Sequence, residues 1–291
     1  MREDVNRLMG ILELEPLEEN LYRGTGAGGE TSQRIFGGQV IAQALRAAYH
    51  TVPEDRFCHS LHAYFIRAGD LTRPVIYEVD RARDGGSFTT RRVVAIQHGK
   101  QILNLSASFH KDEEGHSHQT PMPANMPDPE TLETRDAYRA RIAAQLPEKV
   151  RAEVTRSSPI ELRETDPGDP LNPEKMGATN AVWFRLSDPV EADRRLQHCL
   201  LAYASDLYLL GTSVRAVGES FLTGRIMVAS IDHAMWFHRP FDFSNWHLYA
   251  MESHSVGGGR GFNRGAIYAQ DGTLVASSTQ EGLMRPVTQK A

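Results

Sequence analysis

The feature that most constrains the fold is an order of elements that occurs twice. In each half, a long apolar segment with helical character precedes four runs with strand character. The apolar segments are RIFGGQVIAQALRAAYHTV (34–52) and RRLQHCLLAYASDLYLLGTSV (194–214). Each is apolar around most of its circumference, which is typical of a buried helix. We therefore expect one buried helix in each half.

The strand runs match between the halves in order and in detail. Gln97-His98-Gly99 resembles Gln270-Asp271-Gly272, each as a turn between the two strands of a hairpin. The first set of runs occupies 57–69, 73–85, 87–99 and 100–110, and the second set occupies 226–241, 246–259, 260–272 and 273–285. This pattern predicts a duplicated α+β unit in a double hot-dog arrangement, with two antiparallel sheets each wrapped around a long central helix.

A stretch of different composition separates the two halves. From about residue 111 to residue 173 the chain is rich in Pro, Asp and Glu, which is typical of loops. Within it, TLETRDAYRARIAAQLPEKV (131–150) has the charges of a surface helix. We expect a first hot-dog unit at 1–112, a linker with a surface helix at 113–157 and a second, catalytic unit at 158–291.

Composition disfavours several classes of function. The formal net charge of -5 and the pI of about 6.2 give no general basic field, so we expect no nucleic-acid partner. No run approaches the ~20 apolar residues that span a bilayer, so we expect no membrane partner. The N-terminal residues show no charged-then-apolar leader, and the only cysteines are Cys58 and Cys199. We expect a cytoplasmic protein with no cofactor and no metal.

Asp206 is the most unusual charge in the sequence. It lies among leucines and tyrosines in the second apolar helix segment. An unpaired buried charge is costly, so such a carboxylate must be paired, neutralised or used in chemistry. The pattern alone leaves three interpretations open: a satisfied polar group near a helix end, a residue that faces solvent and a catalytic group.

Further candidates lie on the predicted strands. Alternation along 226–241 places Ser230 and Asp232 on one face and His233 on the other. Gln280 lies late in an apolar strand, where its amide can both donate to and accept from a water molecule. Each of these residues, taken alone, is compatible with an ordinary structural hydrogen bond.

Six motifs together resemble the bacterial acyl-CoA thioesterase II family of the double hot-dog class. They are FGGQVIAQAL, HSLHAYFIRAGD, RDGGSFTTRRVVAIQHGK, YASDLYLL, IDHAMWFHRPF and QDGTLVASSTQEGLMR. The resemblance runs through both halves and the linker. It implies hydrolysis of fatty acyl-CoA to free fatty acid and CoA, in fatty acid metabolism, by a homodimer or homotetramer.

The resemblance also implies a catalytic trio formed by Asp206, Ser230 and Gln280, with Ser230 where some members carry Thr. A thioester carbonyl is electrophilic enough for direct attack by water, with Asp206 as general base and the other two orienting the water. The first half has Gln39 near the place of Asp206 and Ala107 near that of Gln280, so we expect only the second half to be catalytic.

Two alternatives remain open at this point. One is an acyl-CoA hydratase or dehydratase on the same fold, which would use a catalytic histidine; His198 lies eight residues before Asp206 in the sequence. The other is an acyl-CoA-binding protein without turnover, which would not need the trio.

Overall fold

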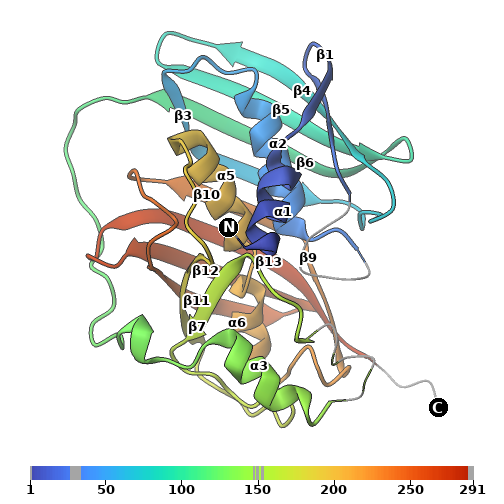
Figure 1. The fold of residues 1–291 in the computed structure, drawn as a ribbon, viewed down its shortest axis with the longest axis vertical. Coiled ribbons are helices and arrows are strands. Elements are labelled where there is room, and N and C mark those ends of the chain that lie inside the picture. Colours follow the sequence, from blue (N-terminus) through green and yellow to red (C-terminus); the bar gives the residue numbers. More distant parts are fainter. Residues whose placement is uncertain (1, 27–33, 147, 149–150, 152–153, 288–291) are drawn as a thin grey trace.

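Strands from both halves of the chain join into one antiparallel sheet, and helices from both halves meet at its centre (Figure 1). The computed structural model describes residues 2–26, 34–146, 148, 151 and 154–287. Along the sheet the order is β1-β2-β4-β5-β6-β3-β10-β13-β12-β11-β8-β7, and β9 pairs with β13. The hot-dog class predicted from the duplication is confirmed, with its two sheets continuous with each other.

The first half surrounds helix α2 (Gly37–Tyr49). Its strands are β1 (Glu15–Glu18), β2 (Leu21–Gly24), β3 (Arg56–Phe65), β4 (Val75–Asp84), β5 (Phe88–Gln97) and β6 (Lys100–Lys111). Helix α2 packs against β4, β5 and β6, and most of its side chains are buried, as its all-round apolar pattern predicts. Helix α1 (Glu3–Leu12) packs on α2.

The second half repeats this plan around a helix that is broken. Its strands are β7 (Ile160–Glu164), β8 (Thr179–Leu186), β9 (Ile226–Ser230), β10 (Asp232–Phe237), β11 (His247–Gly257), β12 (Arg260–Ala269) and β13 (Leu274–Pro286). The single helix predicted over 194–214 forms α5 (Arg194–Ser205) and α6 (Leu209–Ala216) instead. Helix α6 packs against β11, β12 and β13, just as α2 packs against β4, β5 and β6 in the first half. Helix α5 packs against α2.

The halves meet edge to edge and helix to helix. Strands β3 and β10 pair antiparallel, with His62 opposite Ala234. The single strand predicted over 226–241 divides at Ile231, whose N–H donates to the carbonyl of Glu281 and whose carbonyl accepts from the N–H of Phe65. Ile231 thus joins the two halves at the point where β9 ends and β10 begins.

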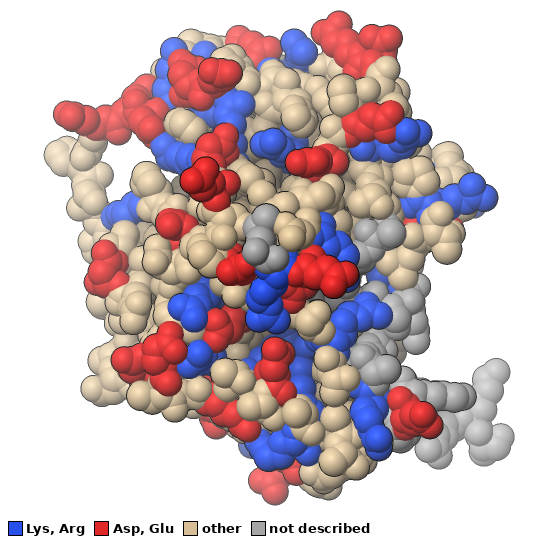
Figure 2. Space-filling model, viewed as in Figure 1, with Lys and Arg blue, Asp and Glu red and all other residues tan. Residues whose placement is uncertain are grey.

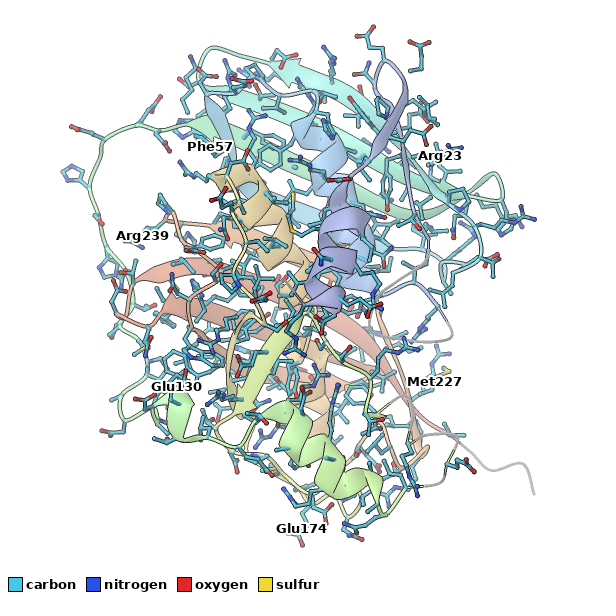
Figure 3. The ribbon with its side chains drawn as sticks, viewed as in Figure 1. Arg23, Phe57, Glu130, Glu174, Met227 and Arg239 are labelled. Carbon is cyan, nitrogen blue, oxygen red and sulfur yellow. The ribbon has the colours of Figure 1, made fainter. Side chains whose placement is uncertain are left out.

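The connection between the halves lies along the outside of the second half. It carries the short helix η1 (Pro129–Thr131) and helix α3 (Arg135–Ala143), which covers part of the predicted surface helix; residues 147, 149 and 150 of that segment lie outside the described residues. Trp246 Nε1 donates to Glu130 Oε1 at 2.8 Å, and Arg239 Nη2 donates to Ser117 Oγ at 3.2 Å. Figure 3 labels Glu130 and Arg239 along this side.

The surface carries charges of both signs. On the face shown in Figure 2, lysine and arginine side chains lie among aspartates and glutamates without a large field of one sign. Among the described residues, no helix combines the length and the apolar character needed to cross a membrane.

The close packing of α2 on α5 gives a first prediction. A Cβ atom at Gly38 would lie 2.2 Å from the carbonyl oxygen of Tyr203, whereas one at Gly10 on α1 would meet nothing within 4 Å. Because Gly38→Ala pushes a methyl group into backbone, we expect it to lower the free energy of unfolding by about 1–3 kcal/mol. The matched control Gly10→Ala should raise it by about 0.5–1 kcal/mol. Equal urea midpoints for Gly38→Ala and the wild type would contradict this packing.

Candidate active site

Asp206 lies at the break between α5 and α6. It caps the C-terminus of α5, and Tyr208, two residues later, adopts a left-handed conformation with φ 69°. Such a conformation is uncommon for a residue with a side chain and marks a place where tertiary structure decides the backbone. The break brings Asp206 to the start of α2, where the N–H of Gly38 donates to its carboxylate.

Glycine is required at this approach of helix to carboxylate. A Cβ atom at Gly37 would lie 2.6 Å from Asp206 Oδ2 and 2.9 Å from the ring of Phe65. The first turn of α2 therefore meets the carboxylate through its backbone. The N-terminus of a helix is the positive end of its dipole, so this position stabilises negative charge on Asp206 or on a bound group.

Gln280 on β13 contacts Asp206 directly. Its Nε2 donates to Asp206 Oδ1 at 2.6 Å, and it lies 3.3 Å from His233 Nδ1. On β10, His233 is fully buried, with Nδ1 4.0 Å from Asp206 Oδ1 and Nε2 2.9 Å from Ser205 Oγ. A carboxylate, an amide and an imidazole thus meet inside the protein.

The surroundings of Asp206 adjust its protonation. Burial raises the pKa of Asp206 to about 6, while the hydrogen bonds from Gln280 and Gly38 and the charge of Arg34 act to lower it. Burial also lowers the pKa of His233 to about 4, so its imidazole is neutral at pH 7. Asp206 is therefore the residue of this cluster that changes charge close to neutral pH, as a general base requires.

Ser230 enters the site from a different strand. It ends β9, opposite Gly282 of β13, and it lines the same cavity of about 650 Å³ as Asp206. No hydrogen bond links its hydroxyl to Asp206 or Gln280 within the described residues. The structure therefore brings Asp206 and Gln280 into contact and places Ser230 on the wall of the cavity that Asp206 lines, while Gln280 lies behind Asp206 and is not part of that wall.

The cavity has an apolar interior with two cationic residues on its wall. Its apolar lining includes Phe36, Val40, Phe65, Leu103, Leu207, Leu210, Phe221, Ile231 and Leu283. The guanidinium-bearing residues are Arg34 and Arg67, both exposed. A smaller cavity of about 390 Å³ shares Leu207, Tyr208, Gly211 and Phe221 with it. At that boundary the Tyr208 hydroxyl donates to the partly buried Glu164 at 2.6 Å.

The other residues discussed from sequence lie elsewhere. His198 Nδ1 is 2.8 Å from the Tyr49 hydroxyl and its ring stacks on Phe237, and it does not line the cavity. Asp232 accepts the backbone N–H of Glu281 at 2.6 Å. Gln39 Nε2 donates to the carbonyl of Thr25 at 3.0 Å. In the described part of the chain, no group of three His, Cys, Asp or Glu side chains is arranged to hold a metal ion.

Sequence reasoning missed three features of the site. It treated His233 as a structural partner without locating it against Asp206, it gave the two glycines at the start of α2 no specific role, and it did not foresee the break at Tyr208. The adjacent Gly37 and Gly38 before an apolar helix were the one available signal, since paired glycines mark a close backbone approach.

Comparisons with known proteins agree with this fold and identify the family. Residues 154–283 match the family model described as acyl-CoA thioesterase, and residues 28–110 match that of the acyl-CoA thioesterase N-terminal domain. Acyl-CoA thioesterase 2 of Haemophilus influenzae is 41% identical over 285 residues, covering 98% of this chain and 99% of that protein. Human acyl-coenzyme A thioesterase 8 is 38% identical, covering 94% of this chain and 88% of that protein. The crystal structure of an acyl-CoA thioesterase II from Mycobacterium marinum has 42% identity and a TM-score of 0.77, covering 97% of this chain and 99% of that one.

The fold is the hot-dog fold, and the matching family models and relatives are acyl-CoA thioesterases, a class of hydrolase. With identity near 40% over almost its whole length, the chain belongs to the acyl-CoA thioesterase II family.

The burial of Asp206 predicts that its replacement by asparagine stabilises the protein at neutral pH. The folded-state pKa of about 6 exceeds the ordinary 3.8, so the folded protein binds the proton more tightly and loses stability as pH rises between these values. Asparagine carries no charge to desolvate. We expect Asp206→Asn to be more stable than the wild type by about 1–3 kcal/mol at pH 7.5, and by much less at pH 4. Urea unfolding at both pH values measures this, and an equal difference at both would contradict it.

Proposed function

We propose that this protein hydrolyses fatty acyl-CoA to free fatty acid and CoA by direct attack of water on the thioester. Asp206 acts as general base, and Ser230 and Gln280 orient the water. The observation that carries this proposal is the buried Asp206 carboxylate, held by Gln280 at the N-terminus of α2 in an apolar cavity.

The chemistry needs no covalent intermediate. A water molecule between Asp206 and the thioester carbonyl gives its proton to the carboxylate as its oxygen adds to the carbon. The first turn of α2, with its positive dipole end, stabilises the oxyanion that forms. When the carbon–sulfur bond breaks, the proton on Asp206 passes to the departing thiolate, and Asp206 returns to its carboxylate form.

The cavity suits the two ends of an acyl-CoA. Its apolar wall, which includes Phe36, Phe65 and Leu210, matches an acyl chain, since burying each CH₂ group contributes about 0.8 kcal/mol. Arg34 and Arg67 are exposed cations on the same wall and match the phosphates of CoA. The substrate would cross the site with its thioester at Asp206.

The same site supports hydrolysis over the alternatives. A hydratase would need a histidine beside the carbonyl. His198 is hydrogen-bonded to Tyr49 outside the cavity. His233, although close to Asp206, does not line the cavity and has its Nε2 on Ser205 Oγ. A binding protein without turnover would not need a carboxylate with a pKa of about 6 in contact with Gln280. In the first half, Gln39 and Ala107 stand near the places of the carboxylate and the amide, so we propose one catalytic site per chain.

The proposal extends to the setting of the enzyme. We propose a cytoplasmic homodimer or homotetramer that acts in fatty acid metabolism without cofactor, metal, nucleic-acid or membrane partner. The two free, buried cysteines suit a reducing compartment. For the chain itself we propose a first unit at 1–112, a linker at 113–157 and a catalytic unit at 158–291.

Thiol release from a chain-length series of acyl-CoAs tests the function. We expect the wild type to release CoA, with kcat/KM rising with pH through about 6 and levelling above it, because Asp206 must be deprotonated to accept a proton. The series also gives the acyl length that the cavity prefers. If no acyl-CoA yields CoA, or if activity falls with rising pH through this range, the proposal is wrong.

Ser230 gives a second test within the site. Ser230→Thr keeps the hydroxyl, so we expect it to retain kcat within about threefold, whereas Ser230→Ala should lower kcat by about tenfold or more, since one hydrogen bond to the water is lost. KM should change little in either variant because the water, not the acyl chain, loses its partner. Equal kcat for the alanine variant and the wild type would remove Ser230 from the mechanism.

A further inference from the structure

Asn263 is a buried amide that the mechanism above does not use. It lies on β12 directly opposite Gln280 on β13, and both side chains are fully buried. Side chains directly opposite each other on one face of an antiparallel pair have Cβ atoms about 4.5–5.5 Å apart. No direct hydrogen bond joins the two amides among the described residues, and at this separation one water molecule can bridge them.

The hydrogen bonds that Asn263 and Gln280 make in the structure leave one end of each amide without a partner. The Ser213 hydroxyl, on α6, donates to Asn263 Oδ1 at 2.7 Å, and Gln280 Nε2 donates to Asp206 at 2.6 Å. Asn263 Nδ2 and Gln280 Oε1 are buried and have no hydrogen-bond partner among the described residues. The remaining groups are one donor and one acceptor, which complement each other.

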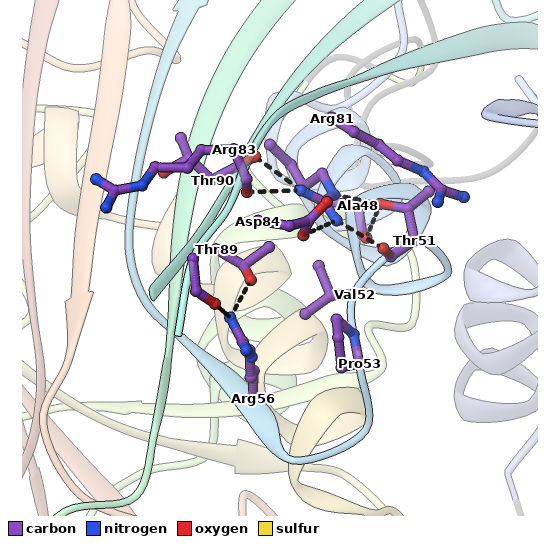
Figure 4. A network of polar contacts seen from close by, with 12 residues as sticks. Ala48, Thr51, Val52, Pro53, Arg56, Arg81, Arg83, Asp84, Thr89 and Thr90 are labelled. Atoms are coloured by element: carbon purple, nitrogen blue, oxygen red, sulfur yellow. Dashed lines mark hydrogen bonds and ion pairs between the residues drawn. The ribbon is translucent and has the colours of Figure 1, made fainter. Parts of the chain in front are cut away.

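The corresponding strand pair of the first half, β5 and β6, gives a comparison, because we propose no catalytic carboxylate there. There Arg91 of β5 lies opposite Ala107 of β6, the residue near the place of Gln280. Arg91 is buried, and its guanidinium donates to Thr51 Oγ1, to the Thr51 carbonyl and to Asp84 Oδ1 at 2.7–2.8 Å. It also donates to the carbonyls of Arg83 and Thr90. Figure 4 labels these partners. Asn263, by contrast, keeps a free donor beside a residue of the site.

We propose that Asn263 is a positioning residue for the hydrolysis proposed above: its Nδ2 holds Gln280 Oε1 through one bridging water molecule, so that Gln280 keeps its Nε2 toward Asp206. A glutamine amide can turn over by rotation of its last torsion, and the turned form would place its oxygen against the carboxylate. With that water in place, the two observed hydrogen bonds, from Ser213 to Asn263 and from Gln280 to Asp206, join into one chain in which each donor strengthens the next.

Loss of these hydrogen bonds changes the pKa of Asp206, which a packing defect alone does not do. The hydrogen bond from Gln280 lowers the pKa of Asp206. If Gln280 turns away, that pKa rises above about 6, and the acid limb of the pH profile moves to higher pH. A variant that only loosens the fold changes stability without moving this limb.

The test uses Asn263→Leu, which keeps the number and branching of the side-chain heavy atoms and removes the donor, and Ser213→Ala, a small change that frees the Asn263 amide. We expect Asn263→Leu to lower kcat by about tenfold, with little change in KM, and Ser213→Ala to lower it less in the same direction. In a Gln280→Leu background, Asn263→Leu should have no further effect on kcat, because it acts through Gln280.

Ser278→Ala is the matched control. Ser278 is a buried neighbour on β13 whose hydroxyl lies 2.7 Å from that of Tyr249. It should lower stability and leave the acid limb in place. Unchanged kcat in Asn263→Leu, or equal losses with and without Gln280, would overturn the proposal.

A second readout separates this proposal from the proposed function. Titration of the ¹³C-labelled Asp206 carboxyl, assigned with Asp206→Asn, reports its pKa without any substrate. We expect a higher pKa in Asn263→Leu and Ser213→Ala than in the wild type and in Ser278→Ala. An identical titration in all four proteins overturns the role of Asn263, whereas failure of the wild type to release CoA overturns only the hydrolase proposal.

Discussion

The site in the second half is built around one interaction, the hydrogen-bonded burial of the Asp206 carboxylate at the N-terminus of α2. A buried charge without partners would cost several kcal/mol. Here the N–H of Gly38 and the amide of Gln280 offset part of that cost and leave a pKa of about 6. The carboxylate therefore persists in the fold with a raised pKa, which makes it a stronger base than an ordinary aspartate, as the proposed mechanism needs.

That interaction accounts for the unusual features around it. The helix has to end at Asp206 for the carboxylate to reach α2, and Tyr208 adopts a left-handed backbone to restart it as α6. Glycine at 37 and 38 allows the approach, because a Cβ atom at either position would collide with the carboxylate or with the backbone of α5. In the first half, α2 has no such break. On the corresponding strand pair, β5 and β6, Arg91 is hydrogen-bonded to structural partners such as Thr51 and Asp84.

The sequence predicted the elements better than it predicted the site. The duplication predicted α2 and the strands that follow it, because apolar periodicity is a local signal. The helix break at Tyr208 could not be predicted from the sequence, because leucines continue on both sides of it and no glycine or proline lies at the break. The role of Asp206 came from the family resemblance. The placement of His233 and Asn263 depends on strand register, which one sequence does not reveal.

Thiol release by Asp206→Asn and by the wild type, measured side by side at pH 7.5 on the acyl-CoA that the wild type turns over fastest, tests the central claim most directly. Asparagine keeps the shape of the side chain and cannot take the proton. The account predicts that turnover falls by at least about a hundredfold while the variant stays folded. Wild-type turnover by Asp206→Asn, or a covalent acyl-protein trapped during wild-type turnover, would contradict direct attack of water activated by this carboxylate.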